Sequence, residues 1–261
     1  LEPLDLSNPL GPMKDTANTD LVYHNGQLLA LWWLSGQPQA VSVPDLNTLG
    51  PARFGGQLRH SMAAHSKVDP RTGELAFFGF SVARRPWYHF GAISADGSRV
   101  HTVELDLPNC HIPHDIAITE HYTLLLDLPL GWDRSAMKHG KRRIAFDRET
   151  PGRIGVVPRW SHADDVRWFE IPSCYVYHTI SAHESGSCIE LVACRIEDMI
   201  PEVPDDSGRT ARLDTIHLVP HLYRWRLNLD TGEVQGEQLD DRATEFPRTN
   251  NQSWTHSARY S

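Results

Sequence analysis

The sequence predicts an all-β fold, and three observations lead to this prediction. Helical periodicity is nearly absent, so few helices are expected. Short runs rich in β-branched and aromatic residues alternate with turn residues, which is typical of antiparallel strands. This pattern continues along all 261 residues, with no helix-rich half. Many short strands form a sandwich, a barrel or a propeller, and their continuation along the whole length favours the radial repetition of a propeller.

Turn motifs define the predicted strands in chain order. They occur at four places, Asn25-Gly26, Asp69–Gly73, Ala95–Ser98 and Asp230–Gly232. The Asn-Gly pair lies within residues 21–33 and is a strong signal for a two-residue hairpin turn. The other three motifs separate strands predicted at 63–68 and 74–81, at 88–93 and 100–107, and at 221–229 and 233–239. Residues 199–214 are polar and rich in proline and glycine, which predicts an exposed loop.

The composition argues against some classes of protein, such as nucleic-acid-binding and membrane-spanning proteins. The formal net charge is -8 and no basic block occurs, which argues against a nucleic-acid partner. The longest apolar runs, Leu28–Leu34 and Leu124–Leu130, are too short to span a bilayer, although a contact with a membrane surface stays open. No secretory signal is visible at the start of the sequence.

The cysteines point to a reducing compartment. The four cysteines form no C-x-x-C pair, so a zinc ribbon or a redox motif is not predicted. Cys174 and Cys188 lie in apolar, strand-like surroundings, where we expect them to be small buried hydrophobic residues. We therefore expect a cytoplasmic protein.

The 15 histidines are the unusual feature of the composition, and three of them have contexts that could aim an imidazole at a metal. His65 precedes a predicted hairpin turn. His114 shares one face of a predicted strand with Ile116 and Ile118. His178 ends an apolar run.

The spacing of these histidines suits a propeller better than a local site. His65 and His114 are 49 residues apart, and His114 and His178 are 64 apart, which is about one ligand per blade. Imidazole ligation suits Fe(II), Cu, Zn or Ni and does not choose among them. Taken singly, a histidine in a strand is more often a half-buried polar residue, so spacing alone does not establish a site.

Several blocks of the sequence resemble, in order, the signature blocks of the carotenoid cleavage oxygenases. That family includes carotenoid cleavers of plants and bacteria, lignostilbene dioxygenases and the retinoid isomerase of the eye. The resemblance runs from about Lys14 to Tyr260. The blocks are AAHSKVDPRTGELAFFGFS, IPHDIAITEHYTLLLDLPL, PGRIGVVPR, WFEIPSCYVYHTISAHE and EFPRTN.

The resemblance implies a seven-bladed β-propeller with one Fe(II) on its axis, held by four histidines. His65, His114 and His178 match the first three ligand positions. The fourth belongs to a C-terminal block that this sequence does not contain, since His256 matches a part of the family pattern that does not bind metal. We therefore expect residues 1–261 to form a single propeller domain that has most but not all blades and is incomplete at both ends.

The resemblance also assigns roles around the ligands. Glu245 matches a glutamate that accepts a hydrogen bond from a ligand imidazole. A second such glutamate is expected directly after Trp32, but Trp33 occupies that position, which weakens the support of one imidazole. Trp32 itself matches a substrate-binding position, where the phenolic-stilbene enzymes have a lysine. An indole cannot pair with a phenolate, so Trp32 favours an apolar polyene or another aryl alkene.

The implied function is a non-haem Fe(II) dioxygenase that splits a carbon–carbon double bond with O₂. The substrate would be a carotenoid, an apocarotenoid or a stilbene-like alkene, and the products two carbonyl compounds. Isomerase or hydrolytic chemistry on the same propeller stays open. So does an inactive propeller fragment that binds an apolar ligand or a partner protein, which the missing fourth histidine and Trp33 favour. The sequence gives neither the exact substrate nor the oligomeric state.

Overall fold

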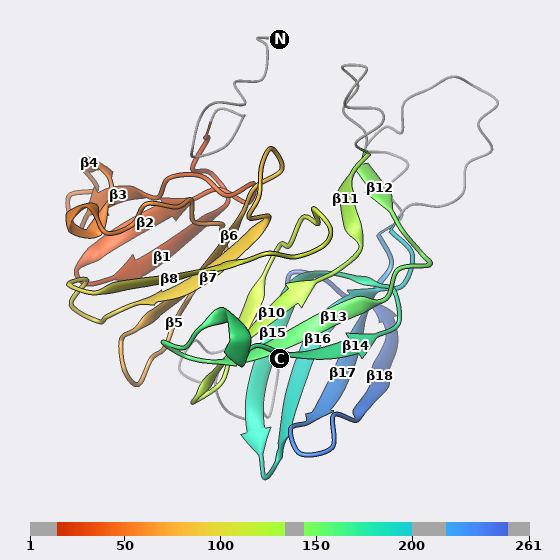
Figure 1. Cartoon of the computed structure of the whole chain (residues 1–261). Helices are drawn as coiled ribbons and strands as arrows, with labels where there is room; N and C mark the ends of the chain where they lie inside the picture. The colour runs from red at the N-terminus through yellow and green to blue at the C-terminus, as the bar shows by residue number, and fades with distance from the viewer. Residues whose placement is uncertain (1–14, 134–143, 200–217, 250–261) are drawn as a thin grey trace, which may run out of the picture.

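Residues 15–133, 144–199 and 218–249 are described by a computed structural model of the chain, and their regular structure is almost entirely β (Figure 1). Four antiparallel sheets of four strands each follow one another along the chain. A two-stranded sheet is inserted, in sequence, between the second and third strands of the third sheet. The all-β prediction is confirmed.

The strands have the following bounds. The first sheet consists of β1 (Asp20–His24), β2 (Gln27–Leu31), β3 (Gln39–Ser42) and β4 (Thr48–Pro51). The second consists of β5 (Lys67–Val68), β6 (Leu75–Phe80), β7 (Tyr88–Ile93) and β8 (Val100–Leu105). The third consists of β9 (Ile116–Ile118), β10 (Tyr122–Asp127), β13 (Gly152–Pro158) and β14 (Arg167–Ile171), with the inserted pair β11 (Leu130–Trp132) and β12 (Ile144–Phe146). The fourth consists of β15 (Tyr175–Ser185), β16 (Cys188–Ile196), β17 (Pro220–Asn228) and β18 (Val234–Ala243). In the described part of the chain, the strands are accompanied by two short 3-10 turns, η1 (Phe54–Gly56) and η2 (Ala163–Asp165).

The four sheets are arranged around a common axis. The first strands of successive sheets contact one another, β1 with β5, β5 with β9, and β9 with β15. Each sheet therefore places its first strand innermost and its last strand outermost, which is the arrangement of propeller blades.

The core lies between successive sheets, and β6 shows how the sequence builds it. All six residues of β6 are buried. Alternate side chains point to opposite faces of a strand, so Phe77 packs with Leu29 of the first sheet while Phe78 packs with Leu125 of the third. A strand that is covered on both faces has a continuous apolar run, which is what this segment shows.

The predicted hairpins are present. Asn25 and Gly26 have φ values of 46° and 78°, the left-handed conformation that a two-residue turn between β1 and β2 requires. The pairs β7–β8 and β17–β18 also follow the predicted runs. The strand predicted at 63–68 is shorter than expected, because only Lys67 and Val68 pair with β6.

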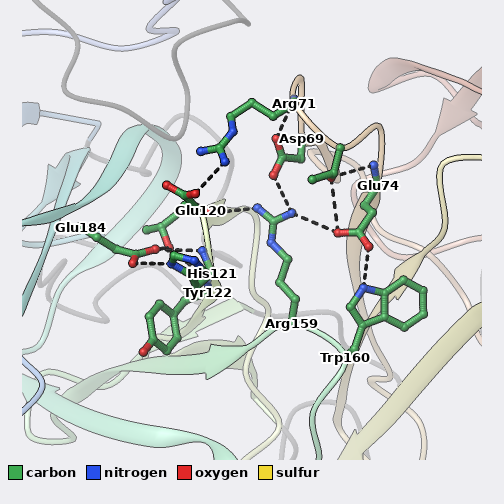
Figure 2. A network of polar contacts seen from close by, with 11 residues as sticks. Asp69, Arg71, Glu74, Glu120, His121, Tyr122, Arg159, Trp160 and Glu184 are labelled. Carbon is green, nitrogen blue, oxygen red and sulfur yellow. Dashed lines mark hydrogen bonds and ion pairs between the residues drawn. The ribbon is translucent and has the colours of Figure 1, made fainter.

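A buried arginine joins three of the sheets (Figure 2). The Arg159 side chain is only 7% exposed, and its Nη1 lies 2.8 Å from Asp69 Oδ2 and 3.5 Å from Glu74 Oε2, both next to strands of the second sheet. Its Nη2 donates to the backbone oxygen of Thr119 in the third sheet. Thr119 Oγ1 in turn donates to Glu184 Oε1 of the fourth sheet at 2.6 Å. This network fixes the neighbouring sheets to one another.

The fold tests some of the remaining predictions and leaves others outside the described residues. Cys174 is buried as expected, but Cys188 is only half-buried because it begins β16 beside the tight turn at Gly186. None of the four cysteines, all of which lie in the described ranges, forms a disulfide bond. The loop predicted at 199–214 falls, apart from its first residue, outside the described residues, as does His256. No helix within the described ranges is long and apolar enough to cross a membrane.

Candidate metal centre

His65 lies in the turn that precedes β5. Its φ of 64° is a left-handed conformation that is uncommon for a residue with a Cβ and that concentrates at functional positions. The turn is fixed on two sides. The backbone nitrogen of Ala63 donates to the oxygen of Phe78 at 2.8 Å, and that of Ala64 donates to the oxygen of Trp32 at 3.1 Å. The first and second sheets together therefore hold the imidazole in place.

His114 lies two residues before β9 and not within a strand, so the predicted alternation with Ile116 and Ile118 is wrong. The ladder starts only at Ile116. The strand begins late because the Asp115 carboxylate accepts the backbone N–H of Ile116 at 2.7 Å. This side-chain hydrogen bond competes with backbone pairing at the start of the strand. The side chain of His114 is buried.

His178 lies at a bulge inside β15, the innermost strand of the fourth sheet. Val176 pairs with Arg195 and Thr179 pairs with Ala193, so two residues of β15 stand opposite one residue of β16. A bulge of this kind bends the strand and turns a side chain away from the direction that simple alternation gives it. The position of His178 in an apolar run therefore did not reveal its direction.

The structure brings the three imidazoles together. The ring centroids of His65 and His114 are 4.9 Å apart, those of His65 and His178 are 5.0 Å apart, and those of His114 and His178 are 5.3 Å apart. One nitrogen from each ring lies within 4.8 Å of the others. Three ligand atoms at such separations can surround one metal ion.

Carboxylates lie behind two of the three rings. Glu245 Oε2 is 2.7 Å from His178 Nδ1. Asp20 Oδ2 is 3.4 Å from His65 Nδ1. A carboxylate only accepts, so the Nδ1 of His178 carries the proton and its Nε2 keeps its lone pair. The Nε2 of His65 is buried and has no hydrogen-bond partner among the described residues.

His114 differs from the other two imidazoles. Its Nδ1 is buried and has no hydrogen-bond partner within the part of the chain that the structure describes. The ring of Trp33 lies 5.9 Å from its ring, centroid to centroid, at the position where the resemblance predicts a glutamate. Burial lowers the pKa of His114 to about 3, and the neighbouring imidazoles of His65 and His178 add to this effect. The ring is therefore neutral, as a metal ligand must be.

Asp115, which the sequence analysis missed, connects the three segments that carry the histidines. Its Oδ1 lies 2.6 Å from Lys67 Nζ, and its Oδ2 accepts the backbone N–H and the hydroxyl of Thr179 at 2.8 and 2.9 Å. Lys67 lies two residues after His65, and Thr179 directly follows His178. Burial opposes the ionisation of Asp115, but the charges of Lys67 and His65 and these hydrogen bonds outweigh it and hold its pKa below the usual value.

The residues present fit a divalent transition metal. The donors are three imidazoles whose ligand nitrogens lie within 4.8 Å of one another, and the buried Nε2 of His65 has no hydrogen-bond partner among the described residues. No fourth histidine joins this group among the described residues. His183, on the same strand as His178, instead has its Nε2 3.8 Å from Glu190 Oε2.

A cavity of about 380 Å³ opens onto His65 and His178. Much of its wall is apolar and includes Val22 and Ile180, and the largely exposed Phe246 also lines it. Trp32 is not among its lining residues. The cavity offers an apolar molecule a place next to the histidines.

Comparison with known proteins decides the family. The profile of the retinal pigment epithelial membrane protein family matches residues 3–261. The chain belongs to this family. The match confirms the resemblance to the carotenoid cleavage oxygenases, because curated relatives carry that name.

Members of the family from several organisms align with nearly the whole chain. The carotenoid 9,10(9',10')-cleavage dioxygenase of Crocus sativus is 37% identical, over 100% of this chain and 47% of its own length. The lignostilbene-alpha,beta-dioxygenase isozyme III of Sphingomonas paucimobilis is 33% identical, over 91% of this chain and 50% of its own length. The chain thus spans about half the length of the curated family members it matches.

Solved structures of family members confirm the β-propeller. The lignostilbene dioxygenase of Pseudomonas brassicacearum superposes with a TM-score of 0.78 at 31% identity, covering 93% of this chain and 51% of that chain. A cobalt-substituted Synechocystis oxygenase superposes with a TM-score of 0.77 at 24% identity, over 94% of this chain and 53% of that chain, and supports the fold alone.

Proposed function

We propose that the chain carries three ligands of a non-haem Fe(II) centre, His65, His114 and His178, in an enzyme that cleaves a carbon–carbon double bond with O₂. The observation that supports this most is the meeting of three imidazoles from three successive sheets within 4.8 Å. Relatives named as carotenoid and lignostilbene dioxygenases add support. The assignment of residues 1–261 to one domain stays a prediction.

The residues of this chain would have distinct tasks in that reaction. His65 and His178 would each offer one ring nitrogen, and the Glu245 carboxylate behind His178 sets the direction of that ring. His114 is kept neutral by burial. Bound Fe(II) would supply the binding and activation of O₂. An electron-rich alkene would itself supply the electrons that reduce O₂, and both oxygen atoms would end in the two carbonyl products, so no further reductant would be required.

The cavity supports an apolar substrate. Its side chains Val22, Ile180 and Phe246 suit a hydrocarbon chain or an aryl ring. Trp32 stands where the phenolic-stilbene enzymes have a lysine, so we propose a polyene or an aryl alkene without an essential phenol. A role for Trp32 in binding stays a prediction, since it does not line the cavity.

Labelling with ¹⁸O₂ tests the reaction. The chain is loaded with Fe(II) without air and mixed with a stilbene or an apocarotenoid under ¹⁸O₂. We expect label in the carbonyl products and no turnover by the His178→Ala variant. Unlabelled products would indicate isomerase or hydrolytic chemistry and would overturn the proposal.

An inactive propeller that binds an apolar ligand is the second candidate. It is favoured by Trp33, which lies against His114 at the position where the resemblance predicts a glutamate. The iron content after anaerobic loading separates the candidates. About one iron per chain supports the enzyme, and a small fraction of one supports the binding protein.

A further inference from the structure

Asp20 is a carboxylate beside the histidine cluster, and no sequence pattern indicated its role. It is the first residue of β1 and pairs with Leu31 of β2, so its backbone is fixed by the sheet. Its Oδ1 accepts the backbone N–H of Leu21 at 2.8 Å. Its Oδ2 lies 3.3 Å from the backbone nitrogen of His65 and 3.4 Å from His65 Nδ1. Each oxygen therefore has its own contacts, and the carboxylate is held towards the imidazole.

We propose that Asp20 is a positioning residue for His65, which holds the Nδ1–H tautomer of this imidazole and so presents Nε2 to a metal ion. The inference rests on the proposed function, since it treats His65 as a ligand. A neutral imidazole carries one proton, and a carboxylate beside Nδ1 places it there. The Nε2 is then an acceptor, and it is buried without a partner among the described residues.

The pair of Asp20 and His65 repeats the pair of Glu245 and His178 on the opposite side of the cluster. Both carboxylates lie beside Nδ1 of their imidazole, which leaves Nε2 as the nitrogen that can bind a metal. The contact of Asp20 is longer, 3.4 Å against 2.7 Å, so its effect is weaker. Loss of such a partner lowers metal affinity roughly 10- to 100-fold, and we place Asp20 at the lower end of this range.

Titration of the full chain with Co(II) tests the effect on metal binding, because the visible absorption of Co(II) reports its coordination. We expect Asp20→Ala to raise the dissociation constant about tenfold. Asp20→Asn, which keeps an acceptor but loses the charge, falls between this variant and the unchanged chain. Asp45→Ala is the matched control, because Asp45 is an exposed aspartate outside the cavity wall, and it leaves the dissociation constant unchanged.

A second measurement needs no metal. Nitrogen-15 NMR of the histidine side chains distinguishes the two tautomers, and His65→Gln identifies the His65 signals. We expect the Nδ1–H form in the unchanged chain and its loss in Asp20→Ala. An unchanged tautomer and a dissociation constant within twofold of the unchanged chain would overturn the role of Asp20 alone. Failure of the unchanged chain to bind Co(II) would instead overturn the proposed function, while the tautomer would still decide whether Asp20 orients His65.

Discussion

Trp33 lies against the imidazole of His114, with 5.9 Å between the ring centroids, and the Nδ1 of that imidazole has no hydrogen-bond partner among the described residues. A buried polar nitrogen without a partner is uncommon and unfavourable. The other two histidines of the cluster each have a carboxylate at the corresponding atom. The cluster is therefore supported unevenly, and His114 is its least constrained member.

Replacing Trp33 by glutamate tests this asymmetry. A glutamate here would accept the Nδ1 proton of His114 and fix its ring, so we expect Trp33→Glu to lower the Co(II) dissociation constant by about tenfold. Trp33→Phe, which adds no acceptor, is the control and leaves the affinity near that of the unchanged chain. Equal affinities for the two variants would show that the missing acceptor does not limit binding.

Removing the carboxylate behind His178 should lower metal affinity more than removing that of Asp20. Glu245 Oε2 is 2.7 Å from Nδ1, so Glu245→Ala loses a charge-assisted hydrogen bond, and we expect the Co(II) dissociation constant to rise about 10- to 100-fold. Glu237→Ala, which removes an exposed partner of Arg224, is the control for loss of a carboxylate. An effect of Glu245→Ala no larger than that of the control would contradict this role.

Asp115 should matter for stability as well as for the site. Its carboxylate is buried, and Asp115→Asn leaves the largely buried ammonium of Lys67 without that negative charge. Breaking a buried pair on one side costs about 3–5 kcal/mol of the free energy of unfolding, measured by urea denaturation. The exposed pair of Arg71 and Glu120 is the comparison, and Glu120→Gln should cost much less than Asp115→Asn, because solvent screens an exposed pair. Similar costs for both variants would refute the role of burial.

His89 should make the fold sensitive to acid. Burial lowers its pKa to about 4, although its Nε2 lies 2.7 Å from the backbone oxygen of Ser61. The unfolded chain then binds the proton more readily between pH 6.5 and 4, so the stabilising contribution is complete above pH 6.5 and is lost as the pH falls towards 4. We expect His89→Gln to reduce this loss by about 3 kcal/mol, as measured by denaturation at several pH values.

The contribution of His121 to stability should have the opposite pH dependence, so this residue serves as the control for His89. This exposed ring pairs with Glu184, which raises its pKa. Its contribution is therefore present at acid pH and is lost as the pH rises through the folded-state value. A His121→Gln variant that also reduced the acid loss of stability would contradict the assignment to His89.

Much of the fold was predictable because it depends on local patterns. Asn25-Gly26 fixes a hairpin through the conformations that these two residues tolerate, and β6 reveals a strand covered on both faces through its continuous apolar run. The directions of the histidines were not predictable in this way. His65 depends on a positive φ, and His178 depends on a bulge, and neither feature leaves a clear sequence pattern.

The carboxylates around the site also depend on contacts that local sequence patterns do not predict. Glu245 was named in advance only through the family resemblance, because its partner His178 is 67 residues away. Asp20 and Asp115 were missed, since their contacts with His65, Lys67 and Thr179 also join segments far apart in the sequence. Without a pattern of covariation, one sequence does not reveal which distant charges meet.

The irregular backbone at the histidines determines which insertions and deletions the cluster tolerates. A left-handed turn aims His65 and a bulge aims His178, so the direction of each ring is set within a few residues and not by the length of the connections between sheets. Insertions in surface loops should leave the cluster assembled. A single-residue deletion between Val176 and Thr179 would remove the first of the two register shifts in β15, reverse the side from which the histidine projects, and dismantle the cluster without removing any of its histidines.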